Sequence, residues 1–189
     1  MGTAEGRKLK EEHDNPINNM IHCVIEVISP IFYKLNITPN QVTLISFIFS
    51  LASIHNLMNS NLRMAAFLWG ISYIFDCLDG YMARKYNLIS KYGDYYDHIS
   101  DIIGFIGLII VFWKQKKYKT IKLLLVMLIP LNIHISCQEN IYDKKEESKT
   151  LNSFNTCWDP LNMIRITRWF GDGSYNLLII LLILKSDFH

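Results

Sequence analysis

Two long apolar runs on either side of one acidic segment restrict most strongly what this chain can fold into. The segment Asp76–Asp101 holds five aspartates and an arginine; it directly follows the run LRMAAFLWGISYIF and is directly followed by the run IIGFIGLIIVFW. Such runs are typical of helices that cross a bilayer, in which a charged side chain near the centre costs about 2.5–3.5 kcal/mol. The aspartates therefore require partners that offset this cost.

The composition indicates a membrane protein of one domain. Half of the 189 residues are apolar, and they gather in runs separated by charged loops. The length suits a single domain, and a net charge of +2 gives no reason to expect nucleic acid as a partner. The four cysteines, Cys23, Cys77, Cys137 and Cys157, lack the spacing of a metal site, so we predict four free thiols.

The apolar patterning predicts an all-α integral membrane protein with five or six transmembrane helices. Residues 1–14 are expected to form a mobile polar tail, and residues 15–189 a single membrane domain. Apolar residues three and four apart between Ile17 and Leu35 predict an amphipathic helix at about 15–36. We expect this helix to lie in the membrane interface, although an ordinary packed helix would show the same pattern.

The predicted spans begin at about residue 41. The first four are Gln41–Met58, Leu62–Ala83, His98–Trp113 and Lys119–Ile135. Residues 137–159 read as a polar loop, and the apolar segments after it are either two spans joined at Gly171-Asp172-Gly173 or one broken span.

Four carboxylates are predicted to converge at one membrane boundary. Asp76 and Asp79 share a face at the end of the second span, and Asp97 and Asp101 share a face at the start of the third. The short loop between these spans makes the two helix ends antiparallel neighbours. Clustered carboxylates repel one another unless they bind cations, and all-oxygen ligands favour Mg²⁺ or Mn²⁺.

The same helix face also suits a phosphate ligand. Gly80 and Ala83 leave it bare of bulky side chains, so that phosphates can approach the backbone. Arg84 follows directly and offers a bidentate guanidinium.

These residues form a pattern that resembles the signature of the CDP-alcohol phosphotransferases, which are integral membrane enzymes of phospholipid synthesis. In this chain it reads Asp76-x2-Asp79-Gly80-x2-Ala83-Arg84-x8-Gly93-x3-Asp97-x3-Asp101. Pro39-Asn40-Gln41-Val42-Thr43 also resembles the P-N-x-x-T element that opens the first span in many members, whereas the last spans look shorter than is usual in that family.

The resemblance implies a role for each matched residue. Asp76, Asp79 and Asp97 would bind Mg²⁺ or Mn²⁺, and Asp101 would be the general base with a further contribution to metal binding. The residues that would bind substrate are Pro39, Asn40, Thr43, Gly80, Ala83, Arg84 and Gly93.

The resemblance also implies the reaction and the partners. A CDP-linked donor, with CDP-diacylglycerol our first choice, would pass its phosphatidyl or substituted phosphoryl group to an alcohol and release CMP. His98 after Asp97 leaves open a choline or ethanolamine phosphotransferase that uses diacylglycerol. We expect a homodimer in the lipid bilayer, with the active site facing the cytosol (on an endoplasmic-reticulum-type membrane in a eukaryote).

Two hypotheses of other classes compete with a transferase. A metal-binding transporter would need acidic or polar residues deep within several spans, whereas this chain keeps its charges at one boundary. An inactive scaffold would have lost a signature aspartate, and none is lost. One feature of the sequence opposes the cytosolic orientation. That orientation places five lysines between residues 114 and 122 on the far side of the membrane, whereas lysines in loops are in excess on the cytosolic side.

Overall fold

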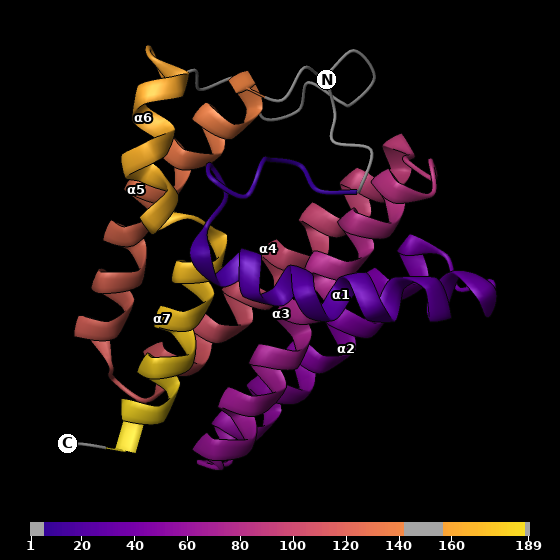
Figure 1. Ribbon diagram of the computed structural model, residues 1–189. Helices are drawn as coiled ribbons and strands as arrows, with labels where there is room; N and C mark the ends of the chain where they lie inside the picture. Colours follow the sequence, from indigo (N-terminus) through magenta and orange to yellow (C-terminus); the bar gives the residue numbers. More distant parts are fainter. Residues whose placement is uncertain (1–5, 142–156, 188–189) are drawn as a thin grey trace.

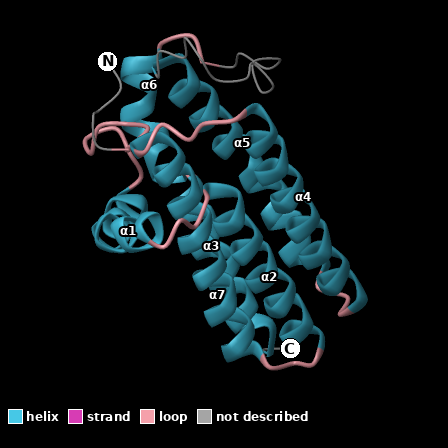
Figure 2. Ribbon diagram, turned by 90° about the vertical axis from the view of Figure 1, so that its right-hand side faces the viewer, coloured by secondary structure: helices cyan, strands magenta, loops and turns pink. Residues whose placement is uncertain are grey.

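The computed structural model of the protein describes residues 6–141 and 157–187, and these residues are all-helical, as predicted. The α-helices in these ranges are α1 Pro16–Lys34, α2 Pro39–Met58, α3 Leu62–Lys85, α4 Lys91–Lys114, α5 Tyr118–Ile141, α6 Pro160–Thr167 and α7 Asp172–Leu184. Helices α2, α3, α4, α5 and α7 form a bundle, and α1 lies across it (Figure 1). After a quarter turn α1 is seen end-on (Figure 2).

Short polar side chains fix where the helices begin. Asn15 caps α1, and Thr38 forms a reciprocal capping box with Gln41 at the start of α2. Ser90 caps α4, so that this helix begins well before His98, where we predicted the third span to start. The loop between α3 and α4 is therefore only residues 86–90.

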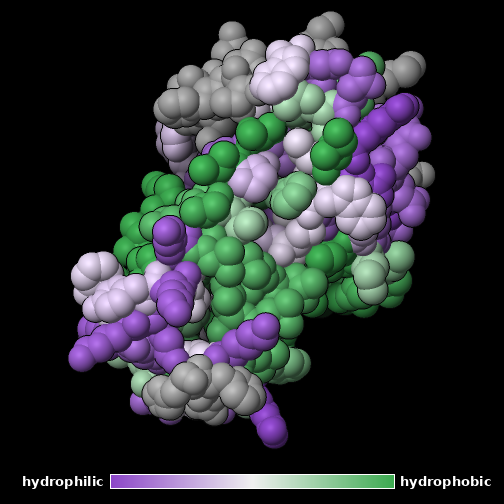
Figure 3. Space-filling model, turned by 90° about the vertical axis from the view of Figure 1, so that its left-hand side faces the viewer, coloured by the Kyte–Doolittle hydropathy of each residue, from purple (hydrophilic) through white to green (hydrophobic). Residues whose placement is uncertain are grey.

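Three helices in the described part of the chain are long and apolar enough to cross a membrane, namely α2, α4 and α5. Helix α3 has 24 residues but carries charged side chains towards its end, and α7 has only 13 residues. On the face in Figure 3, apolar side chains form a band between a polar upper end and a polar lower end. This distribution is the one expected of a membrane protein.

Serine side chains let α2 and α3 approach closely. Ser46 and Ser72 each donate a hydrogen bond to the other's backbone carbonyl at 2.9 Å, and Ser53 donates to the carbonyl of Ala65 at 2.7 Å. Small residues that bond to backbone carbonyls are a common device for packing helices in membranes. This close pair carries Asp76 and Asp79 on its α3 side.

The prediction of four free thiols is wrong for two cysteines. Cys137, near the end of α5, and Cys157 form a disulfide, whereas Cys23 and Cys77 are free as predicted. The two partners are 20 residues apart in the sequence and follow no short motif. Their pairing depends on the chain returning to the end of α5 before α6 begins.

The polar N-terminal segment lies against the protein from residue 6 onwards. Arg7 pairs with Glu26 of α1 at 2.9 Å, and Lys8 pairs with Glu139 of α5 at 2.8 Å. Leu9 is buried. We expected a mobile tail over residues 1–14; residues 1–5 of it lie outside the described residues, and residues 6–14 make these contacts.

Candidate active site

Three of the four predicted carboxylates meet where α3 ends and α4 begins. One oxygen from each of Asp76, Asp97 and Asp101 lies within 4.8 Å of the other two. Asp97 Oδ1 is buried, and no described group donates a hydrogen bond to it. A buried carboxylate oxygen without a donor is costly, and three carboxylates in close proximity repel one another. The arrangement therefore fits a hard divalent cation bound by oxygen ligands.

Asp79, the fourth carboxylate, is directed towards α2. Its Oδ2 accepts a hydrogen bond of 2.6 Å from the Thr43 hydroxyl, and both residues are buried. Asp79 is still close enough to Asp97 and Asp101 to interact electrostatically with them. Thr43, which we predicted to bind substrate, thus holds a signature aspartate in this structure.

The start of α2 also packs against the start of α4. A Cβ atom added to Gly93 would lie 2.8 Å from Asn40 Oδ1, so the absence of a side chain at Gly93 makes room for Asn40. Pro39 is buried in the first turn of α2. The P-N-x-x-T element therefore contacts both helices that carry the carboxylates, through Thr43 to α3 and through Asn40 to α4.

Gly80, Ala83 and Arg84 lie on α3 beside the carboxylates, and all three are half-buried. The Arg84 side chain folds back over Gly80, because a Cβ added to Gly80 would lie 3.2 Å from Nη1 and 3.4 Å from Nη2. Arg84 also attracts the Asp97 carboxylate. The Arg84 guanidinium thus lies next to the carboxylate cluster and over Gly80, which has no side chain.

His98 interacts with two neighbouring aspartates of α4. Its Nε2 lies 3.6 Å from Asp94 Oδ1, and its Nδ1 lies 3.9 Å from Asp97 Oδ2. The imidazole is therefore at the edge of the cluster, on the side of Asp94.

Our sequence reasoning missed Asp172, at the start of α7. Trp69 Nε1 of α3 donates to Asn176 Oδ1 of α7 at 3.0 Å, and the two helices run antiparallel. Tyr73 lies one turn after Trp69 on α3, and Asp172 lies one turn before Asn176 on α7. Because the helices are antiparallel, Tyr73 and Asp172 are therefore at the same level. Asp172 interacts electrostatically with Asp76, one turn further along α3.

Two glycines allow Asp172 to occupy this place. A Cβ on Gly171 would lie 2.8 Å from His134 Nε2, and a Cβ on Gly173 would lie 2.6 Å from both Asn15 Oδ1 and Asn18 Oδ1. The signal in the sequence was the Gly-Asp-Gly at the head of an apolar helix, which we had read only as a joint between segments.

A comparison with protein families shows which family the chain belongs to. The model of the CDP-alcohol phosphatidyltransferase family matches residues 36–155, which include every residue of the signature. The chain belongs to the CDP-alcohol phosphatidyltransferase family. This confirms the resemblance seen in the signature.

Two curated members of the CDP-alcohol phosphatidyltransferase family show partial similarity. Archaetidylinositol phosphate synthase of Pyrococcus horikoshii is 32% identical over 77 residues, which are 41% of each chain. The CDP-diacylglycerol–glycerol-3-phosphate 3-phosphatidyltransferase of Rickettsia felis is 35% identical over 65 residues, which are 34% of this chain and 36% of the relative. The similarity thus spans about two fifths of the relatives' length. No solved structure matches the chain.

Proposed function

We propose that this protein is a metal-dependent phospholipid synthase that transfers a phosphatidyl group from CDP-diacylglycerol to an alcohol and releases CMP. The observation that carries the proposal is the cluster of Asp76, Asp97 and Asp101, with its unpaired oxygen on Asp97, beside the Arg84 guanidinium. Family membership and the name of the Rickettsia relative support the choice of donor.

Mg²⁺ or Mn²⁺ fits the donor set of four carboxylates. Asp76, Asp97 and Asp101 would hold the ion or ions with one oxygen each, and Asp79 would contribute its second oxygen while Oδ2 accepts from Thr43. When bound, such ions neutralise the charge that develops on the phosphoryl oxygens and on the leaving CMP.

The remaining residues would orient the reactants and move one proton. Arg84 would hold the donor phosphates over Gly80, where no side chain blocks their approach. Asp101 is the most exposed carboxylate of the cluster and would accept the proton of the acceptor hydroxyl. The acceptor oxygen forms its bond to phosphorus as the bond between that phosphorus and the CMP oxygen breaks.

We also propose a multi-pass arrangement in the membrane. Helices α2, α3, α4 and α5 would cross it with α7 as a short fifth span, and α1 would lie in the interface. This placement is supported by exposed apolar residues of α1, among them Met20, Val24, Val27 and Ile31. We propose a homodimer by analogy with the family.

The active site would face the cytosol, where CDP-linked donors are available. Two features favour the opposite orientation, namely the lysines between residues 114 and 122 and the Cys137–Cys157 disulfide. Because α4 and α5 form a hairpin, this disulfide lies on the active-site side. A membrane-impermeant thiol reagent tests the orientation, because the exposed Cys23 of α1 lies on that side too.

The test of function is CMP release by the purified protein in lipid nanodiscs. CDP-diacylglycerol is supplied with a panel of alcohols (inositol, serine, glycerol phosphate), and CDP-choline or CDP-ethanolamine is supplied with diacylglycerol. The proposal expects Mg²⁺-dependent CMP release with CDP-diacylglycerol, lost in Asp97→Asn and kept in the matched control Asp94→Asn. Release from CDP-choline alone would establish the alternative donor, and no release from any donor would favour a transporter or an inactive scaffold.

A further inference from the structure

The N-terminal segment Gly6–Asp14, which we call the strap, is fixed to four helices. Its ion pairs reach α1 and α5, and Leu9 is buried in a cluster with Cys137, Cys157 and Ile164 of α6. In Figure 1 the strap runs as an indigo trace from the end of α3 across to α5 and α6. It therefore begins beside the candidate active site, and three residues later Leu9 anchors it in an apolar cluster.

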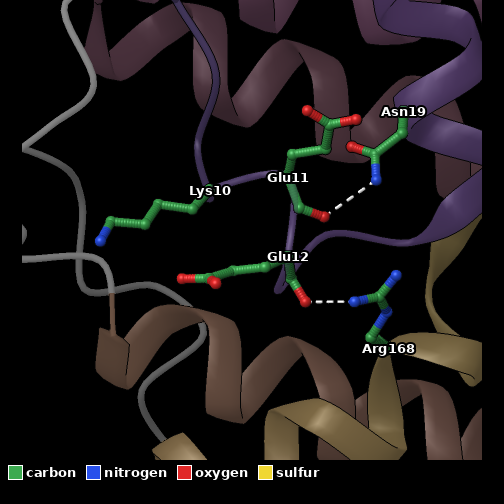
Figure 4. A pocket seen from close by; sticks show the side chains of 5 residues that line it. All are labelled: Lys10, Glu11, Glu12, Asn19 and Arg168. Atoms are coloured by element: carbon green, nitrogen blue, oxygen red, sulfur yellow. Dashed lines mark hydrogen bonds between the residues drawn. The ribbon is translucent and has the colours of Figure 1, made fainter.

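The middle of the strap is held by its backbone, as Figure 4 shows. Asn19 Nδ2 donates to the carbonyl oxygen of Glu11 at 2.9 Å, and Arg168 donates to the carbonyl oxygen of Glu12. A hollow of about 550 Å³ remains between these contacts and the Lys10 side chain. The contacts limit how far the strap can move without breaking several bonds.

Gly6 is the point where the strap meets α3. Its φ of +80° lies in the left-handed region, which strains any residue with a Cβ. A Cβ added there would lie 2.9 Å from Lys85 Cβ and 3.0 Å from the carbonyl oxygen of Tyr81. Because the second of these atoms belongs to the helix backbone, a side chain at Gly6 would push the strap away from α3.

This close approach brings the Gly6 carbonyl to Arg84. Arg84 Nε donates a 2.8 Å hydrogen bond to the Gly6 oxygen. A guanidinium has five N–H donors, so this bond uses one and leaves the four on Nη1 and Nη2. Those two nitrogens are the atoms that lie over Gly80.

We propose that Gly6 is a positioning residue for the transferase, because its carbonyl oxygen fixes the Arg84 guanidinium with both terminal nitrogens directed to the donor phosphates. The inference rests on the proposed function of the site. A rigid, planar fork recognises phosphate with two parallel bonds only when its plane is set. Without the Gly6 contact the arginine keeps its charge but samples several rotamers, so donor binding weakens.

A purely structural role for the strap makes a different prediction. If the strap only stabilised the end of α3, its loss would lower the yield of folded protein and the thermal midpoint. The properties of the folded enzyme towards donor and acceptor would then change together or not at all. A positioning role changes the donor KM selectively.

The test compares Gly6→Ala with the wild type in CMP release and in binding of CDP itself. We expect the donor KM and the CDP Kd to rise about tenfold, because this is the effect of losing one hydrogen bond to a charged group. The acceptor KM should be unchanged. In the Arg84→Lys background, which lacks Nε and the fork, Gly6→Ala should cause no further rise. Unchanged donor KM and CDP Kd in Gly6→Ala would overturn the inference.

A second variant covers the case in which Gly6→Ala does not fold. Leu9→Ala leaves Gly6 intact and weakens the anchor of the strap, so it should also raise the donor KM without changing the acceptor KM. An unchanged donor KM there, with Gly6→Ala unfolded, would equally overturn the inference. A wild-type protein that neither binds CDP nor releases CMP would refute the proposed function instead.

Discussion

Removal of the Thr43 hydroxyl should lower the turnover of the enzyme without abolishing it. Thr43→Val keeps the shape of the side chain and deletes the 2.6 Å hydrogen bond to Asp79. Both residues are buried, and Asp79 is only 5% exposed, so water does not readily replace the lost donor. A hydrogen bond to a charged group contributes about 1.5–3 kcal/mol, and we expect turnover to fall by about 10- to 150-fold.

The matched control for this variant is Thr43→Ser, which retains the hydroxyl and loses only a methyl group. Both variants are purified into nanodiscs and assayed for CMP release and thermal unfolding at saturating Mg²⁺. We expect Thr43→Ser to stay close to the wild type. Equal losses in the valine and serine variants, or full activity in Thr43→Val, would refute the assignment of Thr43 as the group that holds Asp79.

Four further predictions concern the carboxylates, the metal and the disulfide. Asp76→Asn, Asp79→Asn and Asp97→Asn should each abolish CMP release in folded protein, and their double mutants should lose no more, because the ligands share one site; multiplied losses would count against a shared site. Activity should require Mg²⁺ or Mn²⁺ and not be supported by Ca²⁺, which prefers more ligands, and full activity after exhaustive chelation would contradict the metal assignment. Asp101→Asn should lower turnover by about 10²–10⁴-fold with donor binding intact, and loss of donor binding in step with turnover would refute the role of Asp101 as the base and leave it metal binding alone. Removal of the Cys137–Cys157 disulfide by paired serine substitutions should destabilise the protein by about 3 kcal/mol for a loop of this length, and an unchanged thermal midpoint with and without reductant would contradict it.

The sequence alone located the helices and most of the carboxylate cluster. Helical periodicity places Asp97 and Asp101 on one face, and the short loop between the flanking spans requires two antiparallel helix ends. The structure brings Asp76 together with both, as that reasoning predicts. These features are readable because they depend on spacing within single helices and on one short connection.

The limits of the helices were less accessible. The third span was predicted from hydropathy to begin at His98, but α4 begins at Lys91 because Ser90 caps it. Helix α5 likewise continues to Ile141, beyond the predicted end at Ile135. Apolar patterning marks the part of a helix that suits lipid, whereas backbone hydrogen bonds and caps extend the helix into polar surroundings.

Contacts between distant parts of the chain were decided by the tertiary structure. The Thr43–Asp79 bond joins residues 36 apart, and the Gly6–Arg84 bond joins residues 78 apart. No local pattern encodes either, because any hydroxyl or carbonyl brought to the same place would make the same bond. The sequence thus determined which chemical groups line the helix faces. Only the packing of α2 and the strap against α3 decided which of those groups hold one another.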